Sequence, residues 1–157
     1  MRNQRRKKSI QLKKKPAPGV SYAYYEANWN KLPDFSKEKV VSKGVLKNFG
    51  TQPAKRRDGF GFVFTGYLKV GQTGDYQFGL ASDDGSKLWI NDKLVLDADG
   101  IHPADLKTGP VVKLKRGYYK IRVDYFEAHG GEGIQLKWYP PSKKPGWQSV
   151  PQNALYH

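Results

Sequence analysis

From residue 20 to the C-terminus, short stretches rich in aromatic and β-branched residues alternate with turns that contain glycine, asparagine or proline. The clearest stretch is residues 59–70, GFGFVFTGYLKV, in which every even position from 60 to 70 except Gly66 is apolar. Because side chains of an extended strand alternate between two faces, these apolar residues share one face. No stretch shows sustained helical periodicity. The sequence therefore predicts an all-β fold, an antiparallel β-sandwich or barrel.

The same alternation recurs in residues 118–128 and 134–139. Between two shorter stretches stand Asn91 and Asp92, residue types that tolerate the positive φ of a two-residue hairpin turn. Residues 97–109, DADGIHPADLKTG, contain turn residues without alternation and are expected to form a loop. The expected strands are 20–27, 44–49, 59–70, 76–82, 86–90, 93–96, 110–115, 118–128 and 134–139.

The chain of 157 residues is long enough for one domain with a proper core and too short for two comfortable ones. Residues 20–157 are expected to form this module. Residues 1–19 differ in composition, because they are basic and end in the Pro-containing stretch KPAPG, which disfavours regular structure. We therefore expect residues 1–19 to be a linker or the end of a preceding domain.

The formal net charge of +14 is unevenly distributed. Residues 2–15 hold eight Lys and Arg residues and no acid, which leaves +6 for the rest of the chain. A basic arm can bind phosphates by releasing counterions. No recognition helix or RNA-binding motif accompanies this arm, so we expect a solvated linker and no nucleic-acid partner. No apolar run approaches the roughly 20 residues of a membrane helix, so membrane insertion is not expected.

Signatures of catalysis are scarce. The chain has no cysteine, no serine nucleophile elbow and no phosphate-binding loop. The acidic residues are few and most lie in turns, whereas a glycosidase needs two carboxylates held across a cleft. His102, His129 and His157 do not have the paired spacing of metal ligands. We therefore expect the domain to be non-catalytic.

Two carboxylates stand side by side in SDDGSKLWIND, residues 82–92, at Asp83 and Asp84. In extended backbone, adjacent side chains point to opposite faces and do not reach the same partner. Asp-Asp-Gly is common turn chemistry, so a simple turn is one interpretation. The other is that the backbone bends and both carboxylates converge on calcium, an ion that takes six to eight oxygen ligands. The dipeptide alone leaves both interpretations open.

Longer motifs resemble the PA-14 module, which is named after the N-terminal fragment of the protective antigen of a bacterial toxin. The resemblance covers residues 20–157 and implies a β-sandwich-like barrel. Such modules occur as accessory domains in secreted glycoside hydrolases, adhesins and toxins, often with a carbohydrate-binding role. The motifs are YAYYEANWNKLPDF, RRDGFGFVFTGYLKVGQTGDYQFGLASDDG, SDDGSKLWINDKLVLDADGIH, KTGPVVKLKRGYYKIRVDYFEAHGGEGIQLKWYPP and VPQNALYH.

In fungal adhesins of this family, adjacent aspartates are joined by a cis peptide and hold a calcium ion that contacts sugar hydroxyls. By position, the resemblance implies this role for Asp83 and Asp84. A later loop of those lectins supplies one side-chain oxygen and two carbonyls, which Glu127 and the backbone near His129 and Gly131 would supply here. Those lectins usually have asparagine at the position of Glu127. The added charge would strengthen cation binding but would fill coordination positions that a sugar needs.

Three further residues are candidates for a ligand site: Trp89, which lies close to the aspartates, and Asp99 and His102, which lie in the loop after the expected hairpin and could face the same site. Each has a structural alternative. Trp89 could be buried in the second layer of the fold, and Asp99 and His102 lie in a turn-rich loop.

The resemblance implies a non-catalytic carbohydrate-binding module with a calcium site, part of a larger secreted, cell-surface or periplasmic protein such as a glycoside hydrolase. Its partners would be a glycan or polysaccharide and the other domains of the parent protein. The alternative is a structural or interaction module that packs on its parent enzyme and binds no sugar of its own. The loop after Phe126, which is short and has no aromatic residue, favours this alternative.

Overall fold

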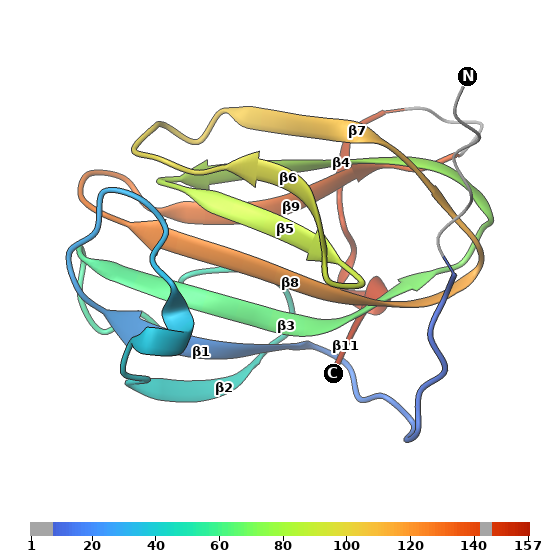
Figure 1. The fold of residues 1–157 in the computed structure, drawn as a ribbon, viewed down its shortest axis with the longest axis horizontal. Helices are drawn as coiled ribbons and strands as arrows, with labels where there is room; N and C mark the ends of the chain where they lie inside the picture. Colours follow the sequence, from blue (N-terminus) through green and yellow to red (C-terminus); the bar gives the residue numbers. More distant parts are fainter. Residues whose placement is uncertain (1–7, 142–145) are drawn as a thin grey trace.

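Two antiparallel sheets lie face to face in the computed structural model, which describes residues 8–141 and 146–157 (Figure 1). This arrangement confirms the all-β sandwich expected from the alternation. Two single 3-10 turns, η1 (Phe35–Lys37) and η2 (Gln152–Ala154), are the only helices of the described residues, and neither is long and apolar enough to cross a membrane.

The strands of the described residues divide into a seven-stranded and a four-stranded sheet. The larger sheet has the order β2 (Ser42–Leu46), β1 (Val20–Glu26), β3 (Phe60–Val70), β8 (Gly117–Glu127), β5 (Ser86–Ile90) and β6 (Lys93–Ala98), with β11 (Leu155–Tyr156) also paired to β3. The smaller sheet has the order β10 (Gln148–Ser149), β9 (Gly133–Tyr139), β4 (Gly74–Asp83) and β7 (Leu106–Leu114).

The hydrophobic core lies between the two sheets and follows the period-two pattern. Phe60, Phe62 and Phe64 of β3 are fully buried, and the rings of Phe62 and Phe64 stack with centroids 5.2 Å apart. Phe78 and Leu80 of β4 enter the same cluster from the smaller sheet. Burying a side chain of this size contributes roughly 1.5–3 kcal/mol to folding. The apolar face of each central strand is thus the face that the other sheet covers.

Strand bounds differ from the expectation around β6 and β7. β6 continues to Ala98 and β7 already begins at Leu106, so the expectation of a loop over residues 97–109 was wrong at both ends. β7 begins early because Leu106 pairs with Ala81 of β4. β7 is an edge strand of the smaller sheet. Backbone hydrogen bonds to β4 can extend such a strand even where its own sequence shows no alternation of apolar and polar residues. Likewise, the strand expected at 44–49 is observed as β2, Ser42–Leu46.

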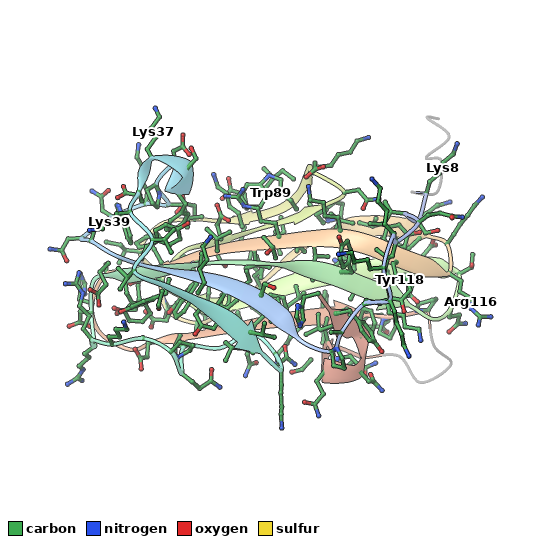
Figure 2. The ribbon with its side chains drawn as sticks, turned by 90° about the horizontal axis from the view of Figure 1, so that it is seen from below. Lys8, Lys37, Lys39, Trp89, Arg116 and Tyr118 are labelled. Atoms are coloured by element: carbon green, nitrogen blue, oxygen red, sulfur yellow. The ribbon has the colours of Figure 1, made fainter. Side chains whose placement is uncertain are left out.

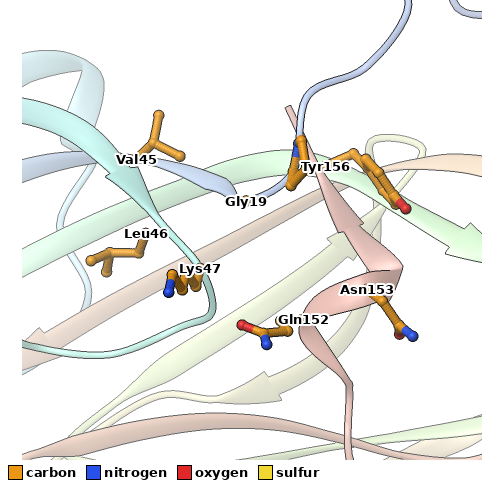
Figure 3. Close-up of a pocket in the computed structure, with 8 residues that line it drawn as sticks. Gly19, Val45, Leu46, Lys47, Gln152, Asn153 and Tyr156 are labelled. Carbon is orange, nitrogen blue, oxygen red and sulfur yellow. The ribbon is translucent and has the colours of Figure 1, made fainter.

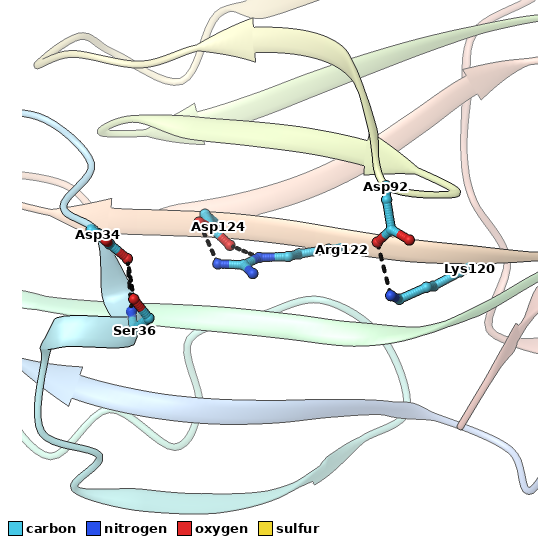
Figure 4. A network of polar contacts seen from close by, with 6 residues as sticks. All are labelled: Asp34, Ser36, Asp92, Lys120, Arg122 and Asp124. Atoms are coloured by element: carbon cyan, nitrogen blue, oxygen red, sulfur yellow. Dashed lines mark hydrogen bonds and ion pairs between the residues drawn. The ribbon is translucent and has the colours of Figure 1, made fainter.

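The turn between β5 and β6 has the expected two residues. Asn91 and Asp92 have φ values of 48° and 66°. The Asn91 side chain accepts a hydrogen bond from the Lys120 backbone at 2.9 Å, and the Lys120 ammonium lies 2.8 Å from the Asp92 carboxylate (Figure 4). The hairpin is therefore tied to β8 as well as to itself.

We expect the Asp92→Val variant to be less stable than Asp92→Gly by about 1–2 kcal/mol, because positive φ is costly for a side chain with a β-branch and not for glycine. Neither variant retains the exposed ion pair with Lys120, so their difference isolates the backbone conformation. Thermal unfolding of the two proteins measures it. Equal melting temperatures would contradict the left-handed conformation at this position.

The described part of the N-terminal segment packs on the domain. The Ile10 amide donates to the Tyr118 carbonyl at 2.8 Å, and Ala17 and His157 exchange backbone hydrogen bonds of 3.0 and 2.9 Å. Residues 8–18 therefore run beside the start of β8 and the end of the chain (Figure 1). Residues 1–7, the other part of the expected basic linker, lie outside the described residues.

A hollow of about 410 Å³ marks the place where the chain enters β1 beside the C-terminal segment (Figure 3). At its edge, Gly19 has a φ of 114°, and a Cβ there would lie 2.7 Å from a methyl group of Val45. Glycine is therefore required at this position for both conformation and space. The lining residues are Pro18, Gly19, Val45, Leu46, Lys47, Gln152, Asn153 and Tyr156.

Candidate metal centre

The link between β4 and β5 brings Asp83 and Asp84 beside the end of β8. After Asp83 the chain leaves the smaller sheet, and it enters the larger sheet at Ser86. On the way, the Asp84 amide donates to the Phe126 carbonyl at 3.2 Å, and the Phe126 amide donates to the Gly85 carbonyl at 3.0 Å. The peptide between Asp83 and Asp84 is cis, as the resemblance implied.

Three carboxylates converge at this point, and all three were singled out from the sequence. One oxygen each of Asp83, Asp84 and Glu127 lies within 4.8 Å of the others. Asp84 is 2% exposed and Glu127 is fully buried. Within the described residues, neither carboxylate oxygen of Glu127 has a hydrogen-bond partner. A buried charge without partners is costly, and a cation between the three carboxylates would supply them.

Hydrogen bonds hold the aspartates in this orientation. The Asp84 carboxylate accepts from the His102 amide at 3.2 Å and from the Ala128 amide at 2.8 Å. The Asp83 carbonyl accepts from the Tyr125 hydroxyl. The geometry of the centre is thus fixed by the protein itself.

The centre concentrates negative charge in a poorly solvated place. Burial raises the pKa of Glu127 to about 7, and the nearby carboxylates of Asp58, Asp84, Asp83 and Glu132 add to the rise. Burial, followed by the charge of Asp84, also raises the pKa of Asp83. Both shifts report a free-energy cost of ionising this cluster, which a bound cation would remove.

The loop after β8 lies next to the centre and is exposed at His129 and Gly131. A Cβ at Gly131 would lie 3.2 Å from a carboxylate oxygen of Asp83, so the backbone passes close to that side chain. The carbonyls of His129 and Gly131 as metal ligands remain a prediction.

A family model described as PA14 domain matches residues 16–146. The chain belongs to the PA14 domain family.

Solved structures share the fold of this PA14 domain at low sequence identity. The PA14 domain of the antifreeze protein MpAFP has a TM-score of 0.75 and 16% identity, over 96% of both chains. A PA14 sugar-binding domain from an RTX adhesin has a TM-score of 0.71 and 16% identity, over 89% of this chain and 98% of its own. The epithelial adhesin 9 A domain from Candida glabrata, solved with Galβ1-4GlcNAc, has a TM-score of 0.69 and 17% identity, over 90% of each. No curated protein matches the sequence.

Asp99 and His102 of the PA14 domain hold loops in place around the centre. The Asp99 carboxylate accepts from the Leu32 amide at 2.8 Å and from the Gly100 amide at 2.7 Å. The ring nitrogens of His102 lie 2.8 Å from the Pro103 carbonyl and 2.6 Å from the Ala98 carbonyl. The structure thus assigns both side chains bonds within the protein, and their contact with a ligand remains a prediction.

The electrostatics of His102 agree with that position. Burial alone would lower its pKa, but the hydrogen bonds to the two carbonyls and the charges of Asp84 and Asp83 raise it above the usual value. Both carbonyls are acceptors, so the doubly protonated ring satisfies both.

Trp89 lies on the outer face of the larger sheet, away from the core (Figure 2). The Arg122 guanidinium lies 5.4 Å from its ring centroid and donates two hydrogen bonds, of 2.7 and 3.1 Å, to the carboxylate of Asp124 (Figure 4). Trp89 therefore packs against Arg122 on the surface of the sheet. The structure does not bring it together with the three carboxylates.

A hollow of about 600 Å³ adjoins the centre and contains residues that sequence reasoning missed as ligand candidates. Trp29 and Ile101 line it together with Ala128 and His129, and Ala128 is the residue whose amide binds Asp84. Ile101 is 49% exposed. The residues of this lining are far apart in the chain, so no local sequence signal indicated that they would meet.

Proposed function

We propose that this PA14 domain is a non-catalytic carbohydrate-binding module whose sugar site is centred on a calcium ion held by Asp83, Asp84 and Glu127. The observation that carries the proposal is the fully buried Glu127 carboxylate, which has no hydrogen-bond partner in the described residues and lies within 4.8 Å of the two aspartates. Such a group fits a cation ligand better than a structural side chain.

Calcium suits this donor set better than a transition metal does. The three side-chain ligands are carboxylates, without thiolate or imidazole, and hard oxygen donors select calcium or magnesium. Calcium accepts irregular geometry and backbone carbonyls, whereas magnesium demands a near-ideal octahedron. Carbonyls near His129 and Gly131 would add to the shell, and hydroxyls of a sugar would complete it.

The hollow beside the centre supplies the second part of a sugar site. Trp29 and Ile101 offer apolar surface next to the polar centre, and sugar rings present an apolar face beside their hydroxyls. Two structural neighbours, the sugar-binding domain of the RTX adhesin and the epithelial adhesin domain solved with Galβ1-4GlcNAc, support the same function at the level of the fold. The parent protein would be exported or exposed at the cell surface, for example a glycoside hydrolase that this module holds on a polysaccharide.

A structural module that packs on its parent enzyme is the second candidate. Glu127 favours it, because a third carboxylate occupies a coordination position that would otherwise be open to a hydroxyl. In that case calcium stabilises the loops and the isolated domain binds no sugar.

A glycan array probed in calcium and in chelator separates the two candidates. We expect calcium-dependent binding that the Asp83→Asn variant abolishes. On the sugar identified, Trp29→Ala should lower the affinity roughly tenfold, in keeping with the loss of one aromatic contact. Trp89→Ala is the matched control, because Trp89 lines a different hollow beside Arg122 and Asp124, and it should change the affinity less than about twofold. Absence of binding to any glycan, with an intact calcium response in thermal unfolding, would leave the structural candidate.

A further inference from the structure

Acidic residues are segregated toward the metal centre. Of the 14 acidic residues, only Asp75 and Asp92 lie at the opposite end of the sandwich, where β3, β5 and β7 end and β4, β6 and β8 begin. Asp92 is neutralised there by Lys120 at 2.8 Å. This end of the domain is therefore nearly free of negative charge.

The same end presents exposed cations from three separate turns. We call it the basic end. It consists of Lys69, Lys93, Lys115 and Arg116, together with Lys8 and Lys13–Lys15 of the N-terminal segment. Lys69 precedes the β3–β4 turn, Lys93 follows the β5–β6 turn, and Lys115 and Arg116 form the β7–β8 turn. These residues are far apart in sequence, and only the fold gathers them.

The N-terminal segment adds four lysines to this end. The Asn91 side chain donates to the Lys8 carbonyl at 3.0 Å, and the bridge between Ile10 and Tyr118 follows directly. The segment is fixed again at Ala17, so the exposed Lys13–Lys15 stretch lies between two anchored points. Figure 2 shows Lys8, Tyr118 and Arg116 at one end of the molecule and Lys37 and Lys39 toward the other. The segment is thus a docked part of the basic end.

We propose that the basic end binds an acidic polysaccharide, one that carries carboxylate or sulfate groups along its length. A polysaccharide of this kind presents a linear array of anions. Each exposed lysine carries a compact positive charge that can pair with one of these anions, and several chain segments together supply enough lysines to follow the array. The choice of a polysaccharide among polyanions rests on the proposed carbohydrate-binding function. Duplex DNA is a poorer match, because no helix or two-stranded ribbon projects from this end to enter a groove in the described residues. The site is separate from the metal centre and does not use calcium.

Calorimetric titration in about 50 mM salt with chelator tests the proposal, with polygalacturonate and heparin as carboxylated and sulfated probes and dextran as the neutral probe. We expect binding to at least one acidic polymer and none to dextran. Changing Lys8, Lys13, Lys14 and Lys15 together to glutamine should weaken binding roughly tenfold and flatten its salt dependence. The matched control changes Lys37, Lys39, Lys43 and Lys55 to glutamine, which removes the same charge away from the N-terminal segment, and should weaken binding less than about threefold.

Equal losses in the two variants would overturn the site, because net charge alone would then explain binding. Tighter binding of a DNA duplex than of either acidic polysaccharide would overturn the choice of ligand, and so would absence of binding to both. The Asp83→Asn variant keeps this test independent of the proposed function. It should lose calcium-dependent glycan binding and retain its affinity for the acidic polymer.

Discussion

We expect calcium at about one hundred times its dissociation constant to raise the melting temperature of the purified domain by roughly 5–10 °C. A ligand that binds only the folded state at this concentration stabilises it by about 2.7 kcal/mol, and each kcal/mol shifts the melting temperature of a domain of this size by roughly 2–4 °C. The gain would arise because the proposed ion would supply partners to the buried Glu127 carboxylate and neutralise the charge that it shares with Asp83 and Asp84. Scanning calorimetry in calcium and in chelator measures the shift.

Asp83→Asn is the informative variant for this experiment. Asp83 is only half-buried, whereas Asp84 accepts two backbone hydrogen bonds whose loss would itself unfold the loops. The variant should lose most of the calcium-dependent rise, and in chelator it should melt at least as high as wild type, because it removes one charge from the cluster. Asp92→Asn removes one carboxylate at the opposite end and should keep the full rise. No shift in wild type at any calcium concentration would eliminate the metal site.

The second large effect is the pH dependence of stability without metal. The pKa of Glu127 in the folded protein is about 7, against 4.5 for an unperturbed glutamate. A carboxyl group with a raised folded-state pKa adds stability that is fully present below its unfolded pKa and lost as the pH rises through its folded pKa. In chelator, the free energy of unfolding should therefore fall by about 3 kcal/mol between pH 4.5 and pH 8 because of Glu127.

Comparison with Glu127→Gln isolates this contribution from the other titrating groups. Glutamine has a similar shape and no charge, so in chelator the variant should be as stable as wild type near pH 5 and more stable at pH 8. In calcium the order should reverse at pH 8, because the variant lacks one anionic ligand. Denaturant unfolding at the two pH values measures all four differences. Parallel pH profiles for wild type and variant in chelator would show that Glu127 is not destabilised by its charge.

Much of the candidate site was predictable because it consists of two local motifs. The family resemblance implied metal-ligand roles for the adjacent Asp83 and Asp84 and for Glu127 at the loop after β8, and their carboxylates do converge. The residues around them were not predictable in the same way. Asp58 and Glu132 raise the pKa of Glu127 from the turns before β3 and β9 although neither was among the expected ligands, and Trp29 lines the hollow from a loop about one hundred residues before Ala128.

The structure places the three further ligand candidates at different distances from the carboxylate cluster. Trp89 follows Asp84 by only five residues, yet the strand carries it to the outer face of the sheet, where it packs with Arg122. Asp99 and His102 do reach the neighbourhood of the centre, but their side chains are occupied by loop amides and carbonyls. Closeness along a strand says little about closeness in space, because neighbouring residues point to opposite faces.

The sequence by itself determined the fold class, the faces of the strands and the β5–β6 turn. These features follow from period-two burial and from local φ preferences, both of which can be read within a few residues. Only the tertiary structure decided where β7 begins, how the N-terminal segment docks beside Tyr118, and that its lysines lie at the end where acidic residues are scarce. Those features depend on pairing between distant segments, and the free energy of such pairing is set by the partner strand and the solvent that it excludes.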